Sequence, residues 1–251
     1  MREKIKIKTV VLLAASLLLF LMNLAVGASN APTEGTCGSE AEWSFEGKTL
    51  TVSGSGPMDD FGKAPWHDFR HKIHQVVVKE GITRIGNNAF YDCLNLQEAV
   101  LTDSVTSIGD MAFYGCFRIE LRFPKGLTDI GVYAFYDCKL TEIDLPDGLL
   151  HIHQMAFAKS STKKVVLPDS IQTIGLNVFD GCKSLKEVRY KGTREQWVDT
   201  QIYANDELFR AGIRFDGDLF KLLPAGIAVL IVFVGGAIVI FRKKRKKYAN
   251  L

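Results

Sequence analysis

Three histidines are the residues best suited to binding a metal ion. His67, His71 and His74 are spaced so that they would share one face of a helix, if the helix continued that far. Imidazole nitrogens are common zinc ligands. However, Ile73 and Val76 begin an alternating apolar pattern, which indicates that His74 already belongs to a strand. We therefore interpret the histidines as a polar surface and predict neither a metal site nor a cofactor.

The five cysteines could form disulfides or bind zinc. Four of them occupy the same position in a recurring pattern: Cys93, Cys116, Cys138 and Cys182. Side chains in such a column point the same way, which is poor geometry for a disulfide. No two cysteines have the Cys-x-x-Cys spacing of a zinc knuckle. We predict that these four are small buried residues. Cys37 stands apart, and an odd total leaves at least one thiol free or paired between chains.

Gly54-Ser55-Gly56 is the stretch that most resembles a nucleotide-binding loop. The third glycine of that motif would fall at position 59, which is Asp59, so the match fails. No phosphate loop, catalytic triad or metalloenzyme signature occurs elsewhere in the sequence. We therefore predict no catalytic residues, and an anchored enzyme is the least favoured of the functions considered.

Two rows of side chains on predicted strands are the strongest candidate for a binding site. The first row is Gln75, Glu98, Glu120, Glu142, Lys164 and Glu187. The second row is Val77, Val100, Arg122, Asp144, Val166 and Arg189. The first row is rich in glutamate, and stacked like charges repel. This pattern fits an acidic strip that awaits a basic partner. Alternatively, Arg122 neutralises Glu120 and Arg189 neutralises Glu187 within the protein.

These rows exist only if the chain folds as stacked repeats. A pattern of Ile-Gly, Ala-Phe and Cys returns in five copies over residues 82–193, with a period of 22–23 residues. His153 and Ser160 replace the Gly and the Cys in the fourth copy, and Val178 replaces the Ala in the fifth. Within one copy, Ile143 and Leu145 alternate with acidic residues, which predicts a half-buried strand. Pro146 then ends it. The period is typical of leucine-rich repeats, whose units bury their apolar faces only by stacking.

The repeats therefore predict an α/β fold, a solenoid whose parallel strands form one curved sheet with a concave binding face. One phenylalanine in each copy should stack into an aromatic spine: Phe90, Phe113, Phe135, Phe157 and Phe179. Residues 29–81 are expected to form an N-terminal β cap. There Trp43 and Phe45, then Leu50 and Val52, alternate on either side of a turn at Gly47. Residues 194–218 should close the other end.

The cap and the repeats together resemble the BspA-type leucine-rich repeat family. The resemblance rests on GTCG, WSF, TLTVSGSGPM, APWHDFR and GITRIGNNAF, and on the closing segment KGTREQW. It covers about residues 35–217 and implies a protein of the bacterial surface that acts as an adhesin or binds host or matrix components. The resemblance is specific for the fold but not for the ligand, because solenoids keep the scaffold and vary the exposed residues.

The two ends of the chain carry membrane signals. Residues 1–28 combine a basic start, an apolar run and the small residues Val26-Gly27-Ala28, which predicts a secretory signal peptide. An uncleaved anchor is the alternative. Residues 219–241 are predicted to be a transmembrane helix, and residues 242–251 a basic cytoplasmic tail. Leu223-Pro224-Ala225-Gly226 resembles a sortase signal but lacks its threonine, so membrane anchoring is favoured over cell-wall attachment.

Charge excludes one class of partner. Outside the signal peptide and the basic tail, 21 Lys and Arg face 27 Asp and Glu, a net charge of −6. A basic footprint for nucleic acid is therefore missing. We expect a single-pass protein with its N-terminal ectodomain outside the cell, acting as a non-catalytic binding or adhesion module for a protein or glycan. A structural or self-associating envelope protein is the alternative.

Overall fold

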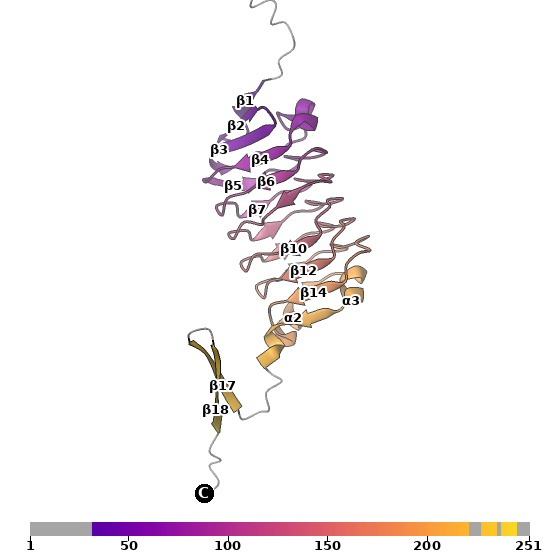
Figure 1. The fold of residues 1–251 in the computed structure, drawn as a ribbon. Coiled ribbons are helices and arrows are strands. Elements are labelled where there is room, and N and C mark those ends of the chain that lie inside the picture. The colour runs from indigo at the N-terminus through magenta and orange to yellow at the C-terminus, as the bar shows by residue number, and fades with distance from the viewer. Residues whose placement is uncertain (1–31, 221–226, 235–236, 245–251) are drawn as a thin grey trace, which may run out of the picture.

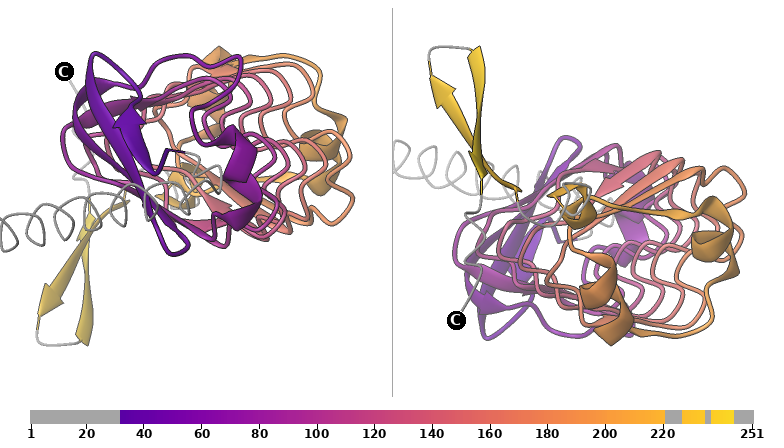
Figure 2. Two further views of the ribbon diagram at one scale, coloured as in Figure 1. Left: turned by 90° about the horizontal axis from the view of Figure 1, so that it is seen from above. Right: turned by 90° about the horizontal axis from the view of Figure 1, so that it is seen from below.

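The computed structural model describes residues 32–220, 227–234 and 237–244, and the first of these ranges winds into a stack of short coils (Figure 1). Viewed from either end, the coils overlie one another (Figure 2). The N-terminal end holds β1 (Glu34–Thr36), β2 (Glu40–Glu46), β3 (Thr49–Pro57) and the 3₁₀ helix η1 (His67–Lys72). The predicted hairpin is confirmed, since β2 and β3 pair antiparallel with Trp43 opposite Val52.

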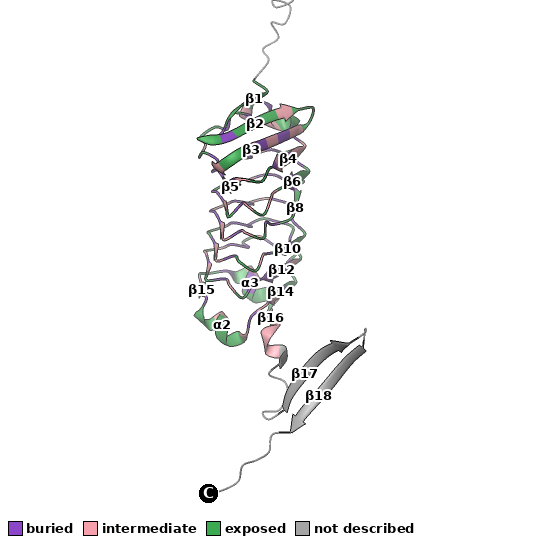
Figure 3. Cartoon of the chain, turned by 90° about the vertical axis from the view of Figure 1, so that its left-hand side faces the viewer, coloured by how far each residue is buried: buried purple, intermediate pink, exposed green. Residues whose placement is uncertain are grey.

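Every coil contributes a strand to each of two parallel sheets, which lie on different sides of the solenoid (Figure 3). The front sheet consists of β4 (Gln75–Val78), β6 (Glu98–Val100), β8 (Glu120–Leu121), β10 (Glu142–Asp144), β12 (Lys164–Leu167), β14 (Glu187–Tyr190) and β16 (Ile213–Phe215). The back sheet consists of β5 (Ile82–Ile85), β7 (Ser107–Ile108), β9 (Asp129–Ile130), β11 (His151–Ile152), β13 (Thr173–Ile174) and β15 (Gln201–Ile202). Strand β3 pairs with both β4 and β5 and so begins both sheets.

Tight turns, rather than helices, form the third side of each coil. Each repeat places two residues, four positions apart, in the left-handed region, for example Asn88 with Asp92 and Tyr133 with Asp137. An α-helix cannot continue through such residues. The α-helices of the described chain, α2 (Arg194–Asp199) and α3 (Asp206–Ala211), lie in the C-terminal cap, followed by the 3₁₀ helix η2 (Gly217–Phe220). The predicted solenoid of parallel strands is confirmed, but each coil contributes to two sheets instead of the one predicted. The α/β label also overstates the helix content.

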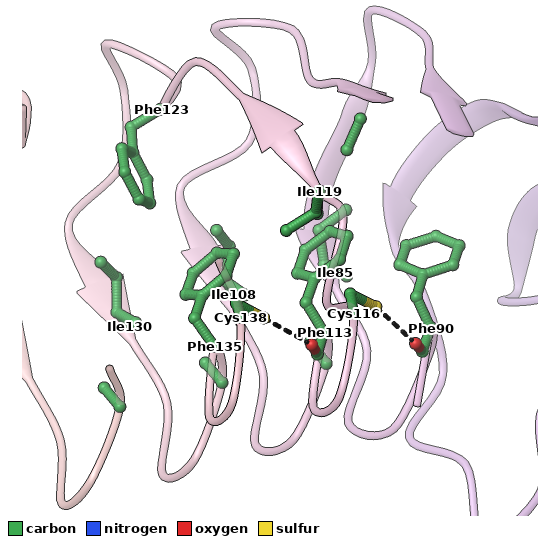
Figure 4. Packing of buried hydrophobic residues seen from close by; sticks show 14 of the residues in the cluster. Ile85, Phe90, Ile108, Phe113, Cys116, Ile119, Phe123, Ile130, Phe135 and Cys138 are labelled. Carbon is green, nitrogen blue, oxygen red and sulfur yellow. Dashed lines mark hydrogen bonds between the residues drawn. The ribbon is translucent and has the colours of Figure 1, made fainter. Parts of the chain in front are cut away.

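The predicted aromatic spine is confirmed. The five phenylalanines are fully buried, and consecutive ring centroids from Phe90 to Phe179 lie 5.1–5.7 Å apart. Trp66 stacks on Phe90 at 5.7 Å and so extends the spine into the N-terminal cap. Figure 4 shows Phe90, Phe113 and Phe135 stacked, with the column of isoleucines beside them. This continuous stack is the main apolar contact between neighbouring coils.

All five cysteines are buried as free thiols. Cys116 and Cys138 each donate a hydrogen bond to the carbonyl of the phenylalanine in the preceding coil, at 3.2 and 3.1 Å (Figure 4). Burial raises the pKa of the Cys37 and Cys93 thiols to about 12 and also raises the pKa of the other three. Because Cys37 is almost completely buried, it cannot pair with a second chain unless the cap opens.

These thiols should be inert in the folded protein. We expect no cysteine to react with a thiol reagent at pH 8, since only the thiolate is nucleophilic, burial raises the pKa of every thiol, and the buried sulfurs are out of reach of the reagent. After denaturation, all five should react. Titration with Ellman's reagent before and after adding guanidinium checks this. Rapid native labelling of Cys37 would contradict the closed cap.

The C-terminal cap continues the solenoid instead of merely covering it. Strand β15 pairs with β13 in the back sheet, and β16 pairs with β14 in the front sheet. The segment from Arg194 to Phe215 therefore forms a sixth coil. Tyr190, Trp197 and Phe215 pack edge to face at its centre, with centroids 4.9–6.2 Å apart.

The predicted membrane segments are only partly within the described residues. The signal peptide, residues 1–28, lies outside them. Within the predicted transmembrane helix, the structure has strands β17 (Ile227–Val234) and β18 (Ala237–Lys244), which pair antiparallel. Among the described residues, no helix has both the length and the apolar character needed to cross a membrane. The run is rich in valine and isoleucine, and an uninterrupted apolar sequence has no periodicity that separates strand from helix.

Candidate functional site

The exposed face of the front sheet carries the two predicted rows. In register, Gln75, Glu98 and Glu120 lie side by side on β4, β6 and β8. Glu142, Lys164 and Glu187 do the same on β10, β12 and β14. The second row follows the same register, with Val77 beside Val100, and Asp144, Val166 and Arg189 in line. Arg122 follows β8 directly and is exposed.

One member of the second row is not on the surface. Val166 is only 8% exposed, contrary to the prediction. It lies between Asp144 and Arg189, and the side chain of Lys191 crosses its coil to reach Asp147 at 2.6 Å and Asp144 at 3.9 Å. This contact joins residues two coils apart, so the spacing within one repeat could not indicate it.

Much of the charge on this face is neutralised, though not by the pairs predicted within each coil. The Gln75 amide donates a hydrogen bond to Glu98 at 2.6 Å, which satisfies that carboxylate but leaves its charge in place. Lys164 lies 3.5 Å from Glu187 in the next coil. Arg189 pairs at 2.6 Å with Asp216 of the terminal coil instead of with Glu187. Neutralisation therefore runs between coils, along the solenoid axis.

Three charged side chains are left over. Within residues 32–220, no hydrogen bond or ion pair joins Glu120, Arg122 or Glu142 to another side chain. All three are exposed. They come from the adjacent coils of β8 and β10, so the uncompensated charge of the face is concentrated near its middle.

The front sheet is interrupted at the same place. Its ladder runs from β3 to β8 and from β10 to β16, and no pairing joins β8 to β10, whereas the back sheet continues past this point from β7 to β9 and β11. The sequence is irregular here. Glu120 follows the buried Ile119 directly, whereas one residue separates Leu96 from Glu98 and Leu140 from Glu142. Strand β8 nevertheless keeps the register of β6, with Glu120 beside Glu98 and Leu121 beside Ala99.

The burial of the inward positions changes at the interruption. Ala99 and Ile143, the inward residues of β6 and β10, are buried, but the corresponding Leu121 is half-exposed. Phe123, the next inward residue, is buried, and its ring meets Phe135 edge to face at 5.5 Å (Figure 4). Leu121 still packs against the core, and its exposed part lies beside charged side chains.

Two hollows open at the interruption. The larger, of about 460 Å³, lies between β8, β10 and the turns that follow them, with Arg122, Lys125 and Lys191 facing Glu142, Asp144 and Asp147 across Leu121, Phe123 and Leu145. The smaller, of about 410 Å³, lies between β6 and β8. Leu121 and Arg122 line both. The sequence prediction included Arg122, Glu142 and Asp144 but missed Leu121. In the sequence, only the irregular spacing after Ile119 distinguishes this copy from the others.

The three histidines of the sequence analysis lie in η1 and just beyond it. Among the described residues, no three histidine, cysteine or acidic side chains lie close enough together to hold a metal ion. His67 lies 3.3 Å from Arg70 within η1, and His74 lies beyond that helix with its ring against the Lys72 carbonyl. The three histidines therefore do not share a helix face.

Parallel strands stacked at this period, with caps at both ends, define a leucine-rich repeat solenoid. The chain belongs to the BspA type leucine-rich repeat family, whose model matches residues 83–208 in six copies. This is one copy more than the five in residues 82–193, and the additional coil is the one that the C-terminal cap forms.

Solved structures of bacterial leucine-rich repeat proteins are similar to this chain. A protein from Eubacterium ventriosum is 27% identical, with a TM-score of 0.59 over 63% of this chain and 44% of its own. One from Bacteroides ovatus is 26% identical, with a TM-score of 0.49 over 68% and 53%. A T. pallidum leucine-rich repeat protein is 17% identical, with a TM-score of 0.50 over 73% and 99%. The chain thus spans about half the length of the first two. No curated protein matched it.

Proposed function

We propose that the protein is a cell-surface binding module that engages a macromolecular partner through the front sheet and performs no chemistry. Leucine-rich repeat solenoids use their exposed sheets for binding, and the family is one of binding proteins. The observation that carries the proposal is that Glu120, Arg122 and Glu142 have no side-chain partner within residues 32–220, whereas the other charged side chains of the two rows do. The solenoid does not need these charged side chains for its stability.

The proposal includes a location. Residues 1–28 direct secretion, residues 219–241 hold the protein at a membrane, and the basic residues 242–251 stay in the cytoplasm. The support for this is the sequence: a charged start with a small-residue cleavage site, and an uncharged segment followed at once by RKKRKK. The front sheet would then face the exterior.

Charge reversal on the face should abolish binding. We expect the variant Glu98→Lys, Glu120→Lys, Glu142→Lys to lose retention on arrays of immobilised surface proteins and glycans, because like charges across an interface cost several kcal/mol. A matched control, Glu34→Lys, Glu80→Lys, Asp199→Lys, makes the same charge change away from the front sheet and should bind as the wild type does. Equal binding by both variants would show that the front sheet is the wrong surface.

Self-association is the second candidate function. Within the described chain, β15 and β16 end the two sheets with one edge unpaired, and strand edges are sites of further pairing. The same coil carries the three most exposed large apolar side chains, Val198, Tyr203 and Phe209. Sedimentation equilibrium tests self-association, because an apparent molecular mass that stays that of the monomer at all concentrations would exclude this function.

A further inference from the structure

We propose that the protein has a second binding surface, outside the front sheet, at which exposed lysines and stacked tyrosines bind an anionic polysaccharide. This surface follows the turns that lead from the back sheet to the front sheet, on the side of the solenoid that carries η1 and α3 (Figure 1). We call it the lysine strip. It consists of Lys159, Lys163, Lys183 and Lys186, and a ladder of three tyrosines adjoins it. The inference goes beyond the proposed function, because none of these residues belongs to the two rows of the front sheet.

The lysine strip concentrates positive charge on an otherwise acidic part of the chain. Residues 159–164 and 180–187 hold five lysines against two acids, Asp180 and Glu187. Glu187 already pairs with the fifth lysine, Lys164, at 3.5 Å. The other four lysines are exposed, and none of them forms an ion pair within residues 32–220. A surplus of one charge sign on a surface attracts a partner of the opposite sign.

The four lysines lie close to one another. The Lys186 amide donates a hydrogen bond to the Lys163 carbonyl at 3.0 Å, so these two side chains leave neighbouring positions of adjacent coils. Lys159 lies against Gly181, two residues before Lys183. Like charges that face each other on neighbouring strands repel, and a polyanion that contacts several lysines at once relieves this repulsion.

The acids nearby do not neutralise the lysine strip. Asp137 and Asp180 lie in the coils on either side of Lys159, but in the described chain neither comes within ion-pair distance of it. Glu207 of α3 pairs instead with Arg210, at 3.2 Å. The other three lysines of the strip therefore carry most of its attraction for an anion.

The tyrosine ladder continues the strip toward the N-terminal coils. Tyr91, Tyr114 and Tyr136 stack with centroids 4.9 and 4.8 Å apart and interplanar angles of 12° and 10°. The amine of Lys159 lies 5.2 Å from the centroid of the Tyr136 ring, so the ladder and the lysines are continuous. All three tyrosines are half-exposed, and within residues 32–220 the hydroxyls of the first two make no hydrogen bond. A row of phenol hydroxyls can donate to and accept from the hydroxyls of successive sugars.

These features favour a polysaccharide over an acidic protein. No large hydrophobic side chain of residues 159–164 or 180–187 is exposed, whereas protein interfaces centre on aromatic or aliphatic anchors. The tyrosine rings cover one another's faces, so the ladder presents ring edges and hydroxyls instead of a pocket. Lysine supplies mobile point charges, which suit the separated carboxylate or sulfate groups of a flexible glycan.

Fluorescence anisotropy with labelled polygalacturonate and labelled dextran sulfate tests this inference. The full-length chain is used in a non-ionic detergent, in a background in which glutamine replaces the six cations of residues 242–247, so that the basic tail does not bind the probes. The strip variant is Lys163→Gln, Lys183→Gln, Lys186→Gln. The matched control removes three exposed lysines of the N-terminal cap: Lys48→Gln, Lys72→Gln, Lys79→Gln. Thermal melts followed by circular dichroism verify that all variants fold.

We expect the background chain to bind at least one of the two polysaccharides and not to bind neutral dextran. The strip variant should bind at least about tenfold more weakly, and the control should change by less than about threefold, because exposed charge contacts are individually weak and the strip variant loses three. The variant Tyr91→Phe, Tyr114→Phe keeps the ladder but removes two hydroxyls, and it should bind about threefold more weakly.

Equal losses in the strip variant and the control, or no binding of either polysaccharide, would overturn the inference. Equally tight binding of labelled polyglutamate, or an unchanged affinity of the tyrosine variant, would overturn it in favour of an acidic protein. The front-sheet charge-reversal variant should bind the polysaccharide at least as tightly as the background chain, and a loss would place the glycan on that sheet instead. Failure of the strip leaves the proposed function standing, because that function is measured with the front-sheet variant.

Discussion

Truncating Phe135 to alanine is expected to lower the free energy of unfolding by about 3–5 kcal/mol, the range for a large buried aromatic side chain. Its ring is fully buried and stacks between Phe113 at 5.2 Å and Phe157 at 5.4 Å. Phe123 also packs against it. The cavity would therefore open in the middle of the spine, where backbone hydrogen bonds from Phe113 to Ala134 and from Phe135 to Ala156 hold the neighbouring coils and resist collapse. Guanidinium unfolding followed by circular dichroism measures the loss.

Leu94→Ala is the control for this substitution. Leu94 is 45% exposed, and surface substitutions usually change stability by no more than about 0.5 kcal/mol. A loss below about 1 kcal/mol for Phe135→Ala would show that the spine does not hold the coils together. Because each coil contacts only its neighbours, the substitution should also make unfolding less cooperative, dividing the stack near its centre.

The sequence was most informative where one side chain recurs at a fixed position. The phenylalanine and cysteine columns followed directly, because a residue that returns every 22–23 positions returns to the same place in each coil. The strands of the back sheet could not be predicted from the sequence, because elements such as Ser107–Ile108 are too short to show a period. The turns were equally hidden, since Met111, Tyr133 and Met155 adopt a left-handed conformation that their types do not favour.

The candidate site was harder to predict than the fold. The two rows of side chains could be aligned from the sequence. Whether their charges are paired depends on contacts between coils, such as Lys191 with Asp147, and no local pattern encodes these contacts. Looking for what the repeats share also hides the hollow between β8 and β10, because this hollow arises where one copy departs from the others. One residue fewer separates Ile119 from Glu120 than separates Leu140 from Glu142, and this irregular copy is the one in which β8 and β10 are unpaired and Leu121 is partly exposed. In a repeat protein, irregularities of this kind are where specificity is best sought.

Replacing Asn205 with alanine is expected to lower the free energy of unfolding by about 2–4 kcal/mol. The side chain is 1% exposed and joins the terminal coil to the one before it. Its carbonyl oxygen accepts a hydrogen bond from the Val178 amide at 2.7 Å, and its amide nitrogen donates to the carbonyls of Gly175 and Tyr203, both at 2.8 Å. Alanine would remove all three bonds, and a buried group left without a partner costs about 1–3 kcal/mol. Entry of water at this last coil limits the total.

Tyr203→Ala provides the comparison, because it shortens an exposed side chain of the same coil and leaves the backbone carbonyl that Asn205 contacts. It should change stability by no more than about 0.5 kcal/mol. Hydrogen exchange then locates the effect: in Asn205→Ala the Val178 amide should lose protection, while amides of β10 and β12 keep theirs, because a repeat stack opens from its ends. Similar stability of the two variants would mean that the cap is held by its apolar contacts. Selective fraying would instead leave the coils of β8 and β10 intact.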